Sequence, residues 1–230
     1  MGIFDLLNHW DKEFFLYLNG FHNSFWDYTM TLFTITQVWI PFYLIILVII
    51  AKKFGKKSLY IFLAITLLIL FADQFAGIFK HSVKRLRPSH DPEISQLAHL
   101  FFNTGGLYGF VSAHSANAFS IATFTILLFK NRLYTYFIIP WAMMIAYTRI
   151  YLGVHYPGDI LGGAVLGILI GMGIYRLLIY TEKQFIKGKP FSGNTLNDRE
   201  ALIIITTGCF VVILTMITVS SLLGNQLLKV

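Results

Sequence analysis

The chain has 230 residues, of which 56% are hydrophobic and only 13% are charged, about half the charged share of an ordinary globular domain. A soluble domain needs charge to cover its surface, so this composition, with a mean hydropathy of +0.67, indicates a membrane protein. It excludes disordered, fibrous and disulfide-stapled classes, since there is one cysteine, Cys209. The net charge of +7 then reflects the Lys and Arg excess of cytoplasmic loops rather than nucleic-acid binding.

Residues 1–24 predict a short amphipathic helix. Acidic residues, among them Asp5 and Asp11, lie where a signal peptide would be basic. The apolar positions that recur at helical spacing are Ile3, Leu6, Leu7, Trp10, Phe14 and Tyr17. The pattern fits a helix lying in the membrane interface, and it fits equally well a cap packed on a helical bundle.

Residues 25–230 predict an all-α, polytopic membrane domain, a bundle of six transmembrane helices. The six apolar stretches are 28–51, 58–79, 113–129, 133–150, 158–180 and 200–223. Pro41 and Pro140 fall inside two of them, where neighbouring helices can cover a kink. Gly163, Gly167 and Gly171 recur every fourth residue in the fifth stretch, which predicts a stripe for close helix packing.

The distribution of basic residues predicts the orientation of these spans. The loops after the first, third and fifth spans hold 11 of the 18 Lys and Arg residues. By the positive-inside rule, those loops are cytoplasmic and both termini are outside. The chain is therefore expected in the inner (cytoplasmic) membrane. Residues 88–111, rich in Pro and Gly, would form an irregular lid-like loop on the periplasmic or exterior face.

Three polar clusters lie at the outer ends of the predicted spans. In the first, Lys80, Lys84 and Arg87 would share one helical face if the second span continued to Pro88. Convergent cations at a membrane surface suit a phosphate group. Taken alone, the cluster fits better with an anchor for anionic lipid headgroups.

The second cluster precedes the third span, and the third lies between the fourth and fifth. Ser112 would cap a helix N-terminus, where free N–H groups favour an anion, and His114 follows it. His155 and Asp159 are four residues apart, so the carboxylate can hold one imidazole nitrogen and leave the other free as a nucleophile. Arg149 would add a phosphate contact. Alone, these clusters also fit a simple helix cap and an Arg–Asp ion pair.

Together the clusters resemble the signature of the type 2 phosphatidic acid phosphatase superfamily. Its pattern is Lys, six residues, Arg-Pro; then Pro-Ser-Gly-His; then Ser-Arg, five residues, His, three residues, Asp. The matching residues stand here in the same order: Lys80, Arg87, Pro88, Ser112, His114, Arg149, His155 and Asp159. Val111, Ala113 and Thr148 replace the family's proline, glycine and serine; the extra methyl of Ala113 bears on the fine geometry of the phosphate, and Thr148 keeps a hydroxyl for phosphate contact.

The resemblance, which covers most of residues 25–180, implies a metal-independent lipid phosphatase that needs no cofactor. His155 would attack phosphorus and form a phosphohistidine, Asp159 would steady its imidazole, and His114 would protonate the leaving oxygen. The binding residues that would neutralise the phosphate oxygens are Lys80, Arg87, Ser112 and Arg149.

The sequence also fits three rival interpretations. The same residues resemble those of vanadate-dependent haloperoxidases, but those proteins are soluble. Asp73, inside the second span, could serve an ion or lipid transporter, although it stands alone and fits a hydrogen bond within the bundle better. A metal site could draw on His90, Asp91, Glu93 and His99, but their spacing matches no dense ligand motif.

The expected partner is a phosphorylated membrane lipid. Lys84 and Arg85 beside the site favour a doubly charged pyrophosphate or a bulky anionic headgroup. Undecaprenyl pyrophosphate is the first expectation and a lipid A phosphate the second. Phosphatidylglycerol phosphate and phosphatidic acid also qualify. The sequence indicates no oligomeric state.

Overall fold

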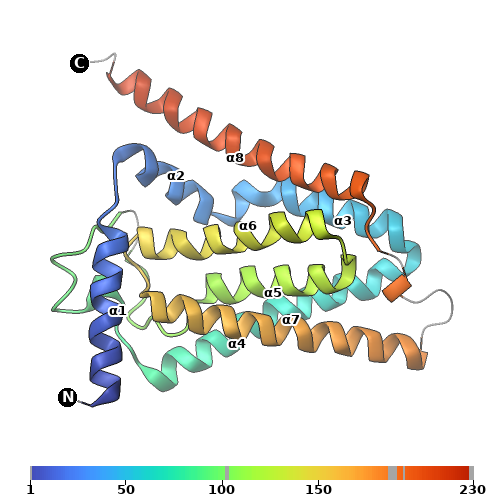
Figure 1. Ribbon diagram of the computed structural model, residues 1–230, viewed down its shortest axis with the longest axis horizontal. Helices are drawn as coiled ribbons and strands as arrows, with labels where there is room; N and C mark the ends of the chain where they lie inside the picture. The colour runs from blue at the N-terminus through green and yellow to red at the C-terminus, as the bar shows by residue number, and fades with distance from the viewer. Residues whose placement is uncertain (1, 102–103, 186–190, 194, 228–230) are drawn as a thin grey trace.

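The computed structural model describes the chain apart from residues 1, 102–103, 186–190, 194 and 228–230. The described part is helical, with one isolated β-bridge between Leu86 and Tyr108. Its α-helices are α1 (Ile3–Asn19), α2 (Ser24–Thr34), α3 (Ile40–Phe54), α4 (Ser58–Val83), α5 (Ala113–Phe129), α6 (Arg132–Tyr151), α7 (Pro157–Phe185) and α8 (Asp198–Leu227). Helices α3 to α8 run side by side along the long axis, and α1 lies across one end (Figure 1).

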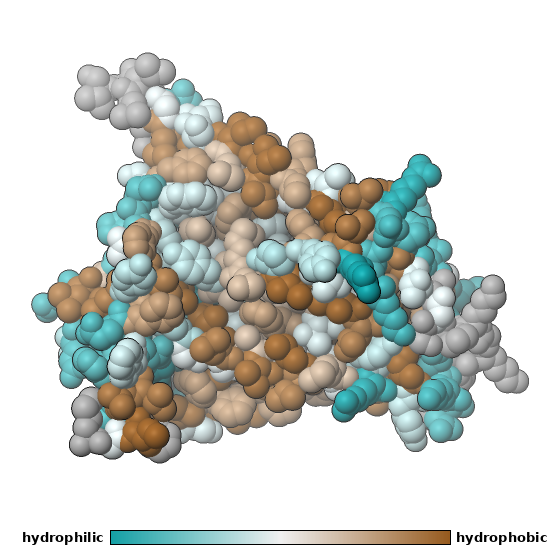
Figure 2. Space-filling model, viewed as in Figure 1, coloured by the Kyte–Doolittle hydropathy of each residue, from teal (hydrophilic) through white to brown (hydrophobic). Residues whose placement is uncertain are grey.

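The surface agrees with a membrane environment. Three helical stretches are long and apolar enough to cross a bilayer: Thr36–Val83, Pro157–Gln184 and Asp198–Asn225. The first contains both α3 and α4, and α5 is a shorter apolar helix. Apolar side chains cover the middle of the bundle, while hydrophilic ones gather toward its ends (Figure 2). Length and hydropathy thus support the predicted membrane bundle but not the count of six spans.

The first predicted span, 28–51, is not one continuous helix. Helix α2 ends at Thr34, Ile35 is extended, and a short 3-10 turn, Thr36–Trp39, leads into α3. Pro41 lies in the first turn of α3, where a missing amide hydrogen costs nothing because no carbonyl precedes it in the helix. The proline therefore begins a helix rather than kinking one. Pro140, by contrast, does lie inside α6 as predicted.

Helix α4 does not continue to Pro88. It ends at Val83, and Lys84 caps it in the left-handed conformation, with a φ of 53°. The chain then turns into an extended segment in which Leu86 pairs with Tyr108. Lys80, Lys84 and Arg87 consequently do not share one helical face, and the prediction that they do was wrong.

The predicted glycine stripe is confirmed at the contact of α5 with α7. A Cβ added at Gly163 would lie 2.5 Å from the Ser112 carbonyl oxygen, and one added at Gly167 would collide with the Ala116 carbonyl oxygen. Only glycine lets the two backbones approach so closely. This contact fixes the N-terminus of α5 against the first turn of α7, which is where the predicted site residues lie.

Helix α1 leaves its apolar stripe exposed. Leu7, Trp10 and Phe14 are 60%, 66% and 53% exposed, whereas Phe15 on the other side is fully buried against Tyr156. Polar residues also face the bundle: the Lys12 ammonium pairs with Asp91 at 2.8 Å. Helix α1 is thus fastened to the bundle through Phe15 and a polar face, with its apolar stripe exposed.

Candidate active site

The His155–Asp159 pair lies where α6 passes into α7. Pro157 begins α7, so the four-residue spacing places the Asp159 carboxylate beneath the His155 imidazole, with 3.3 Å between Nδ1 and Oδ2. Both residues are buried, at 2% and 0% exposure. The Tyr156 backbone N–H also donates to Asp159 Oδ2, at 3.1 Å. Because Asp159 holds Nδ1, the lone pair for a nucleophile belongs to Nε2.

The other oxygen of Asp159 is held by Arg85. The Arg85 guanidinium donates to Asp159 Oδ1 at 3.2 Å and to Asp11 Oδ2 at 2.7 Å. It also lies over the Tyr156 ring, 4.2 Å from the centroid. Asp11 in turn accepts from the Gly158 N–H at 2.8 Å. Arg85 thus connects helix α1 to the buried carboxylate.

The sequence did not indicate these roles for Arg85 and Asp11. Arg85 was visible only as one of several basic residues in its cluster, and it was expected to face an anionic headgroup. Asp11 lies 74 residues before it, and no spacing rule links an interfacial helix to a loop so far along the chain. A buried carboxylate such as Asp159 does require a cation nearby, but the sequence offered several candidates.

The loop before α5 closes over the pair. Gly109 donates its N–H to the Arg85 carbonyl at 2.8 Å, and a Cβ on it would lie 2.6 Å from Asp159 Oδ2. The Ser112 N–H donates to the Asp159 carbonyl at 3.0 Å. These backbone contacts fix the end of the loop, and with it the start of α5, against the first turn of α7.

Two of the predicted phosphate-binding arginines are held in place by the surrounding chain. Arg87 is buried and donates to the Tyr108 carbonyl at 3.1 Å and the Val154 carbonyl at 3.3 Å. Arg149 donates from Nη1 to the Thr34 hydroxyl at 2.6 Å. Thr34 ends α2, so the break in the first predicted span supplies a partner for Arg149. Lys80 lies in the last turn of α4, half-buried.

Arg87, Arg149 and Lys80 act electrostatically on His155. The pKa of His155 lies well below the ordinary histidine value, because burial disfavours the charged ring and because Arg87, Arg149 and Lys80 add positive charge nearby. The imidazole is therefore neutral at physiological pH, as a nucleophile must be. The same three positive charges would attract a phosphate dianion to the position facing the ring.

Ser112 and His114 occupy the N-terminus of α5, as predicted. Ser112 is the N-cap, and its hydroxyl oxygen accepts from the Ser115 N–H at 3.4 Å. Its side chain is fully buried, so the capping role is observed and phosphate contact stays a prediction. His114 is exposed into a cavity between α3, α4, α5 and α6.

Of the three departures from the family signature, Val111 and Thr148 are buried and Ala113 is partly exposed. Val111 is 2% exposed and fills the space beside Gly162, where a Cβ would lie 2.9 Å from Val111 Cγ1. Ala113 borders the same cavity as His114. The Thr148 hydroxyl donates to the Ile145 carbonyl at 2.7 Å inside α6 and is fully buried, so it faces its own helix.

The four residues considered for a metal site do not come together. Asp91 and Glu93 pair with Lys12, and the His90 ring Nδ1 lies 3.0 Å from the Ser89 hydroxyl. His99 instead meets His22 and Asp27, with 2.8 Å between its Nε2 and Asp27 Oδ1.

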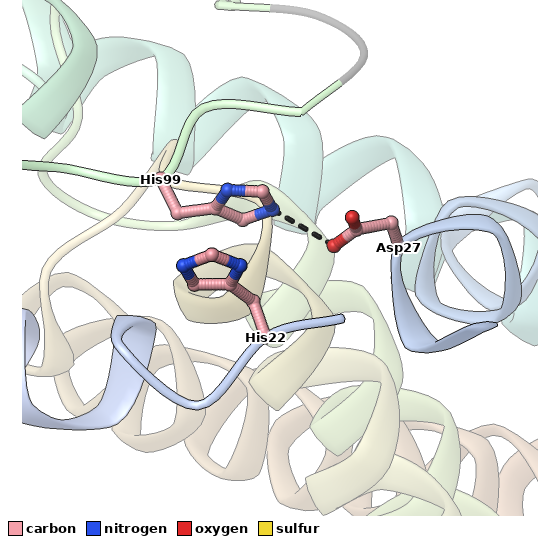
Figure 3. A group of neighbouring side chains, drawn as sticks. All are labelled: His22, Asp27 and His99. Atoms are coloured by element: carbon pink, nitrogen blue, oxygen red, sulfur yellow. Dashed lines mark hydrogen bonds and ion pairs between the residues drawn. The ribbon is translucent and has the colours of Figure 1, made fainter. Parts of the chain in front are cut away.

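Figure 3 shows that the His99 ring is aimed at Asp27 and that the His22 ring lies alongside it. The two rings are parallel within 1°, with centroids 3.7 Å apart. Lone pairs of parallel stacked rings do not converge on one point, as tetrahedral coordination requires. Asp27 Oδ1 also accepts from the Tyr151 hydroxyl at 2.8 Å. The arrangement fastens the loop around His99 to α2 and α6 and is not that of a coordination sphere.

Comparison with known proteins agrees with the geometry. The model of the PAP2 superfamily matches residues 57–183. The chain is 39% identical over 209 residues to the lipid A 4'-phosphatase of Bacteroides thetaiotaomicron, covering 89% of this chain and 92% of that protein. It is 33% identical over 179 residues to the lipid A 4'-phosphatase of Porphyromonas gingivalis, covering 76% of each.

Among solved structures, the crystal structure of LpxE from Aquifex aeolicus superimposes with a TM-score of 0.53 at 27% identity. The match covers 71% of this chain and 93% of that one. The family match spans more than half of the chain and includes every residue of the resemblance noted in the sequence. The chain therefore belongs to the PAP2 superfamily, and it is a membrane-embedded phosphatase that hydrolyses phosphate esters of lipids.

Proposed function

We propose that this protein removes the 4'-phosphate of lipid A. The observation that carries the proposal is the similarity to lipid A 4'-phosphatases along 89% of the chain, combined with a site whose three cations suit a phosphate dianion. Undecaprenyl pyrophosphate, the first expectation from the sequence, is not supported by these relatives. The argument for it used Lys84 and Arg85 as cations that favour a doubly charged pyrophosphate, and Arg85 is paired with Asp11 and Asp159.

The proposed reaction has two steps. In the first, Nε2 of His155 attacks phosphorus, the bond to the sugar oxygen breaks, and His114, which carries its proton as imidazolium beside the bound phosphate dianion, gives that oxygen a proton. Asp159 at Nδ1 stabilises the positive charge that develops on the ring. In the second, water attacks the phosphohistidine and the bond between phosphorus and Nε2 breaks. His114, neutral after the first step, takes the proton from the water, so that inorganic phosphate leaves and both histidines return to their starting states.

The remaining site residues are proposed to bind the phosphate. Lys80, Arg87 and Arg149, with the N–H groups at the start of α5, would face the three equatorial oxygens, where charge is spread in the transition state. Because Arg87 is already fixed by two carbonyls and Arg149 by a hydroxyl, little reorganisation would be needed when substrate binds.

The membrane placement is also a proposal. The chain would cross the inner membrane six times, with α2 and α3 together forming one broken span. Helix α1 would lie in the outer interface, its exposed stripe of Leu7, Trp10 and Phe14 facing lipid. The excess of basic residues in the alternate loops supports a site on the periplasmic face.

Mass spectrometry of lipid A after incubation with the purified protein in detergent tests the substrate. We expect the loss of one phosphate, and fragmentation should locate it on the distal sugar. His155→Gln should abolish the reaction. Release of the 1-phosphate instead, or turnover of undecaprenyl pyrophosphate alone, would overturn the proposed substrate.

A further inference from the structure

A cavity of about 290 Å³ lies beside His114. It lies between α3, α4, α5 and α6 and reaches the break between α2 and α3. Its lining mixes aromatic and polar side chains, the latter being Thr34, Thr36, Asp73, His114 and Asn117. Its volume is near the lower end of the range of small-ligand sites, which suits one ring of a substrate rather than a whole lipid.

Asp73 is a carboxylate inside the stretch Thr36–Val83. It lies seven residues before Lys80 on α4, which is about 10 Å along the helix axis. The residue is exposed, and it borders the cavity. A carboxylate inside a membrane span is costly unless it meets a polar partner. Asp73 has such a partner in Asn117, which confirms the hydrogen bond within the bundle that was expected of it.

Asn117 places a hydrogen-bond acceptor on the same cavity. Its amide nitrogen donates to Asp73 Oδ1 at 2.7 Å, and this contact fixes the amide orientation, because a carboxylate accepts and does not donate. The other end of the amide, Asn117 Oδ1, is buried and has no hydrogen-bond partner among the described residues. Asn117 lies one turn after His114 on α5, so the two side chains share a helical face.

Other unpartnered polar atoms gather around this cavity. Within the described ranges, three buried side-chain nitrogen and oxygen atoms lack a hydrogen-bond partner: Asn117 Oδ1, Trp141 Nε1 and Arg149 Nε. Asn117 and Trp141 both border the cavity, and Arg149 is bonded to Thr34, which borders it too. A buried polar group without a partner costs about 1 to 3 kcal/mol, so a concentration of them indicates a site where a ligand completes the bonds.

We infer that this cavity binds the alcohol part of the substrate, the part that leaves when phosphate is removed, and that this part is a sugar ring carrying hydroxyl or amide groups. Asp73 and Asn117 Oδ1 accept hydrogen bonds from its donors, and Trp141 Nε1 donates to its oxygens. The partly buried ring of Tyr43, which borders the cavity, suits the apolar face of a sugar. A hydrocarbon leaving group would satisfy none of these atoms.

This inference rests on the proposed reaction, in which His114 delivers a proton to the leaving oxygen. The leaving group must then lie on the His114 side of the phosphate, which is the side of the cavity. Selectivity arises because a site built to hydrogen-bond a hydroxyl rejects analogues that lack it.

Two variants remove single polar atoms from the cavity. Trp141→Phe deletes the indole N–H while keeping an aromatic ring, and Asn117→Leu deletes the acceptor at similar volume. Each should lower kcat/KM for lipid A roughly tenfold or more. Hydrolysis of phosphatidic acid, whose leaving alcohol carries neither a further hydroxyl nor an amide, should change less than about threefold. Thr66→Val, on α4 outside the cavity, is the matched control.

A binding measurement separates the site from the proposed function. Octyl N-acetylglucosaminide should bind the wild-type protein, as observed by saturation-transfer NMR in a detergent without sugar, and should bind Trp141→Phe at least tenfold more weakly. The binding of octanol should be the same in Trp141→Phe as in the wild-type protein. If the protein binds the glycoside through Trp141 but does not hydrolyse lipid A, the sugar site stands and the lipid A assignment is rejected.

The opposite outcomes overturn the inference. If Trp141→Phe hydrolyses lipid A and binds the glycoside as the wild type does, the cavity is no sugar site, whatever the substrate. Equal losses on lipid A and phosphatidic acid, with a lowered melting temperature, would show that the cavity residues act through stability alone. Should Asn117→Leu fail to fold, Trp141→Phe still decides between these results.

Discussion

Replacing Arg85 tests whether helix α1 supports catalysis through Asp159. Arg85→Met keeps most of the side-chain bulk and removes the guanidinium that joins Asp159 and Asp11. Asp159 would retain two donors, the His155 ring and the Tyr156 N–H, but would lose its cation. A buried carboxylate without its cation orients and stabilises the reacting imidazole less well.

The structure gives the size of the effect. A hydrogen bond to a charged group contributes about 1.5 to 3 kcal/mol, which is roughly 10- to 150-fold in rate. The Arg85 side chain is 21% exposed, so solvent screening favours the lower half of that range. We expect kcat to fall about 10- to 30-fold with KM nearly unchanged. Asp11→Asn, which keeps the oxygen that accepts from Gly158, should cost only a few-fold.

The assay is phosphate release from lipid substrate in detergent, with kcat and KM measured for each variant. Because Asp11 acts on Asp159 through Arg85, the double variant should resemble Arg85→Met alone. Arg132→Met, an exposed arginine at the start of α6, is the control for loss of a positive charge. A kcat within twofold of wild type for Arg85→Met would refute the reasoning, and a raised KM with normal kcat would place Arg85 on the substrate instead.

Three further outcomes are expected. Gly167→Leu should lower the free energy of unfolding by about 1 to 3 kcal/mol, because its side chain would collide with the Ala116 carbonyl. The melting temperature should fall accordingly, and an unchanged melting temperature would contradict the close contact of α5 with α7. In the free enzyme, nitrogen-15 spectra should show His155 neutral at pH 5.5, since its pKa is lowered well below 6.5 and it takes up a proton only at more acidic pH; a transition near 6.5 would disprove this. Activity should survive EDTA, and loss that zinc restores would revive a metal mechanism.

Single helices and turns could be predicted from capping residues, apolar runs and residue spacing. The third predicted span, 113–129, coincides with α5, because Ser112 is a strong N-cap and a long apolar run follows it. The glycine stripe and the four-residue spacing of His155 and Asp159 are properties of one helix or one turn, so they follow from sequence spacing.

Contacts between distant segments could not be predicted in the same way. The break after Thr34 lies in a run that is apolar enough to continue, and it matters because Thr34 meets Arg149, 115 residues away. The end of α4 at Val83 depends likewise on the pairing of Leu86 with Tyr108. Neither partner leaves a periodic signal in the chain, since each bond is specified by the packed bundle.

The direction in which α1 faces has a practical consequence for anyone handling the protein. A helix whose apolar stripe is exposed is positioned partly by the lipid or detergent that covers that stripe. This helix carries Asp11, which is linked through Arg85 to Asp159, the carboxylate that contacts His155. The choice of detergent, or a bulky tag at the N-terminus, therefore acts on turnover as well as on solubility. Specific activity in lipid nanodiscs should exceed that in a harsh micelle even when both preparations are fully folded.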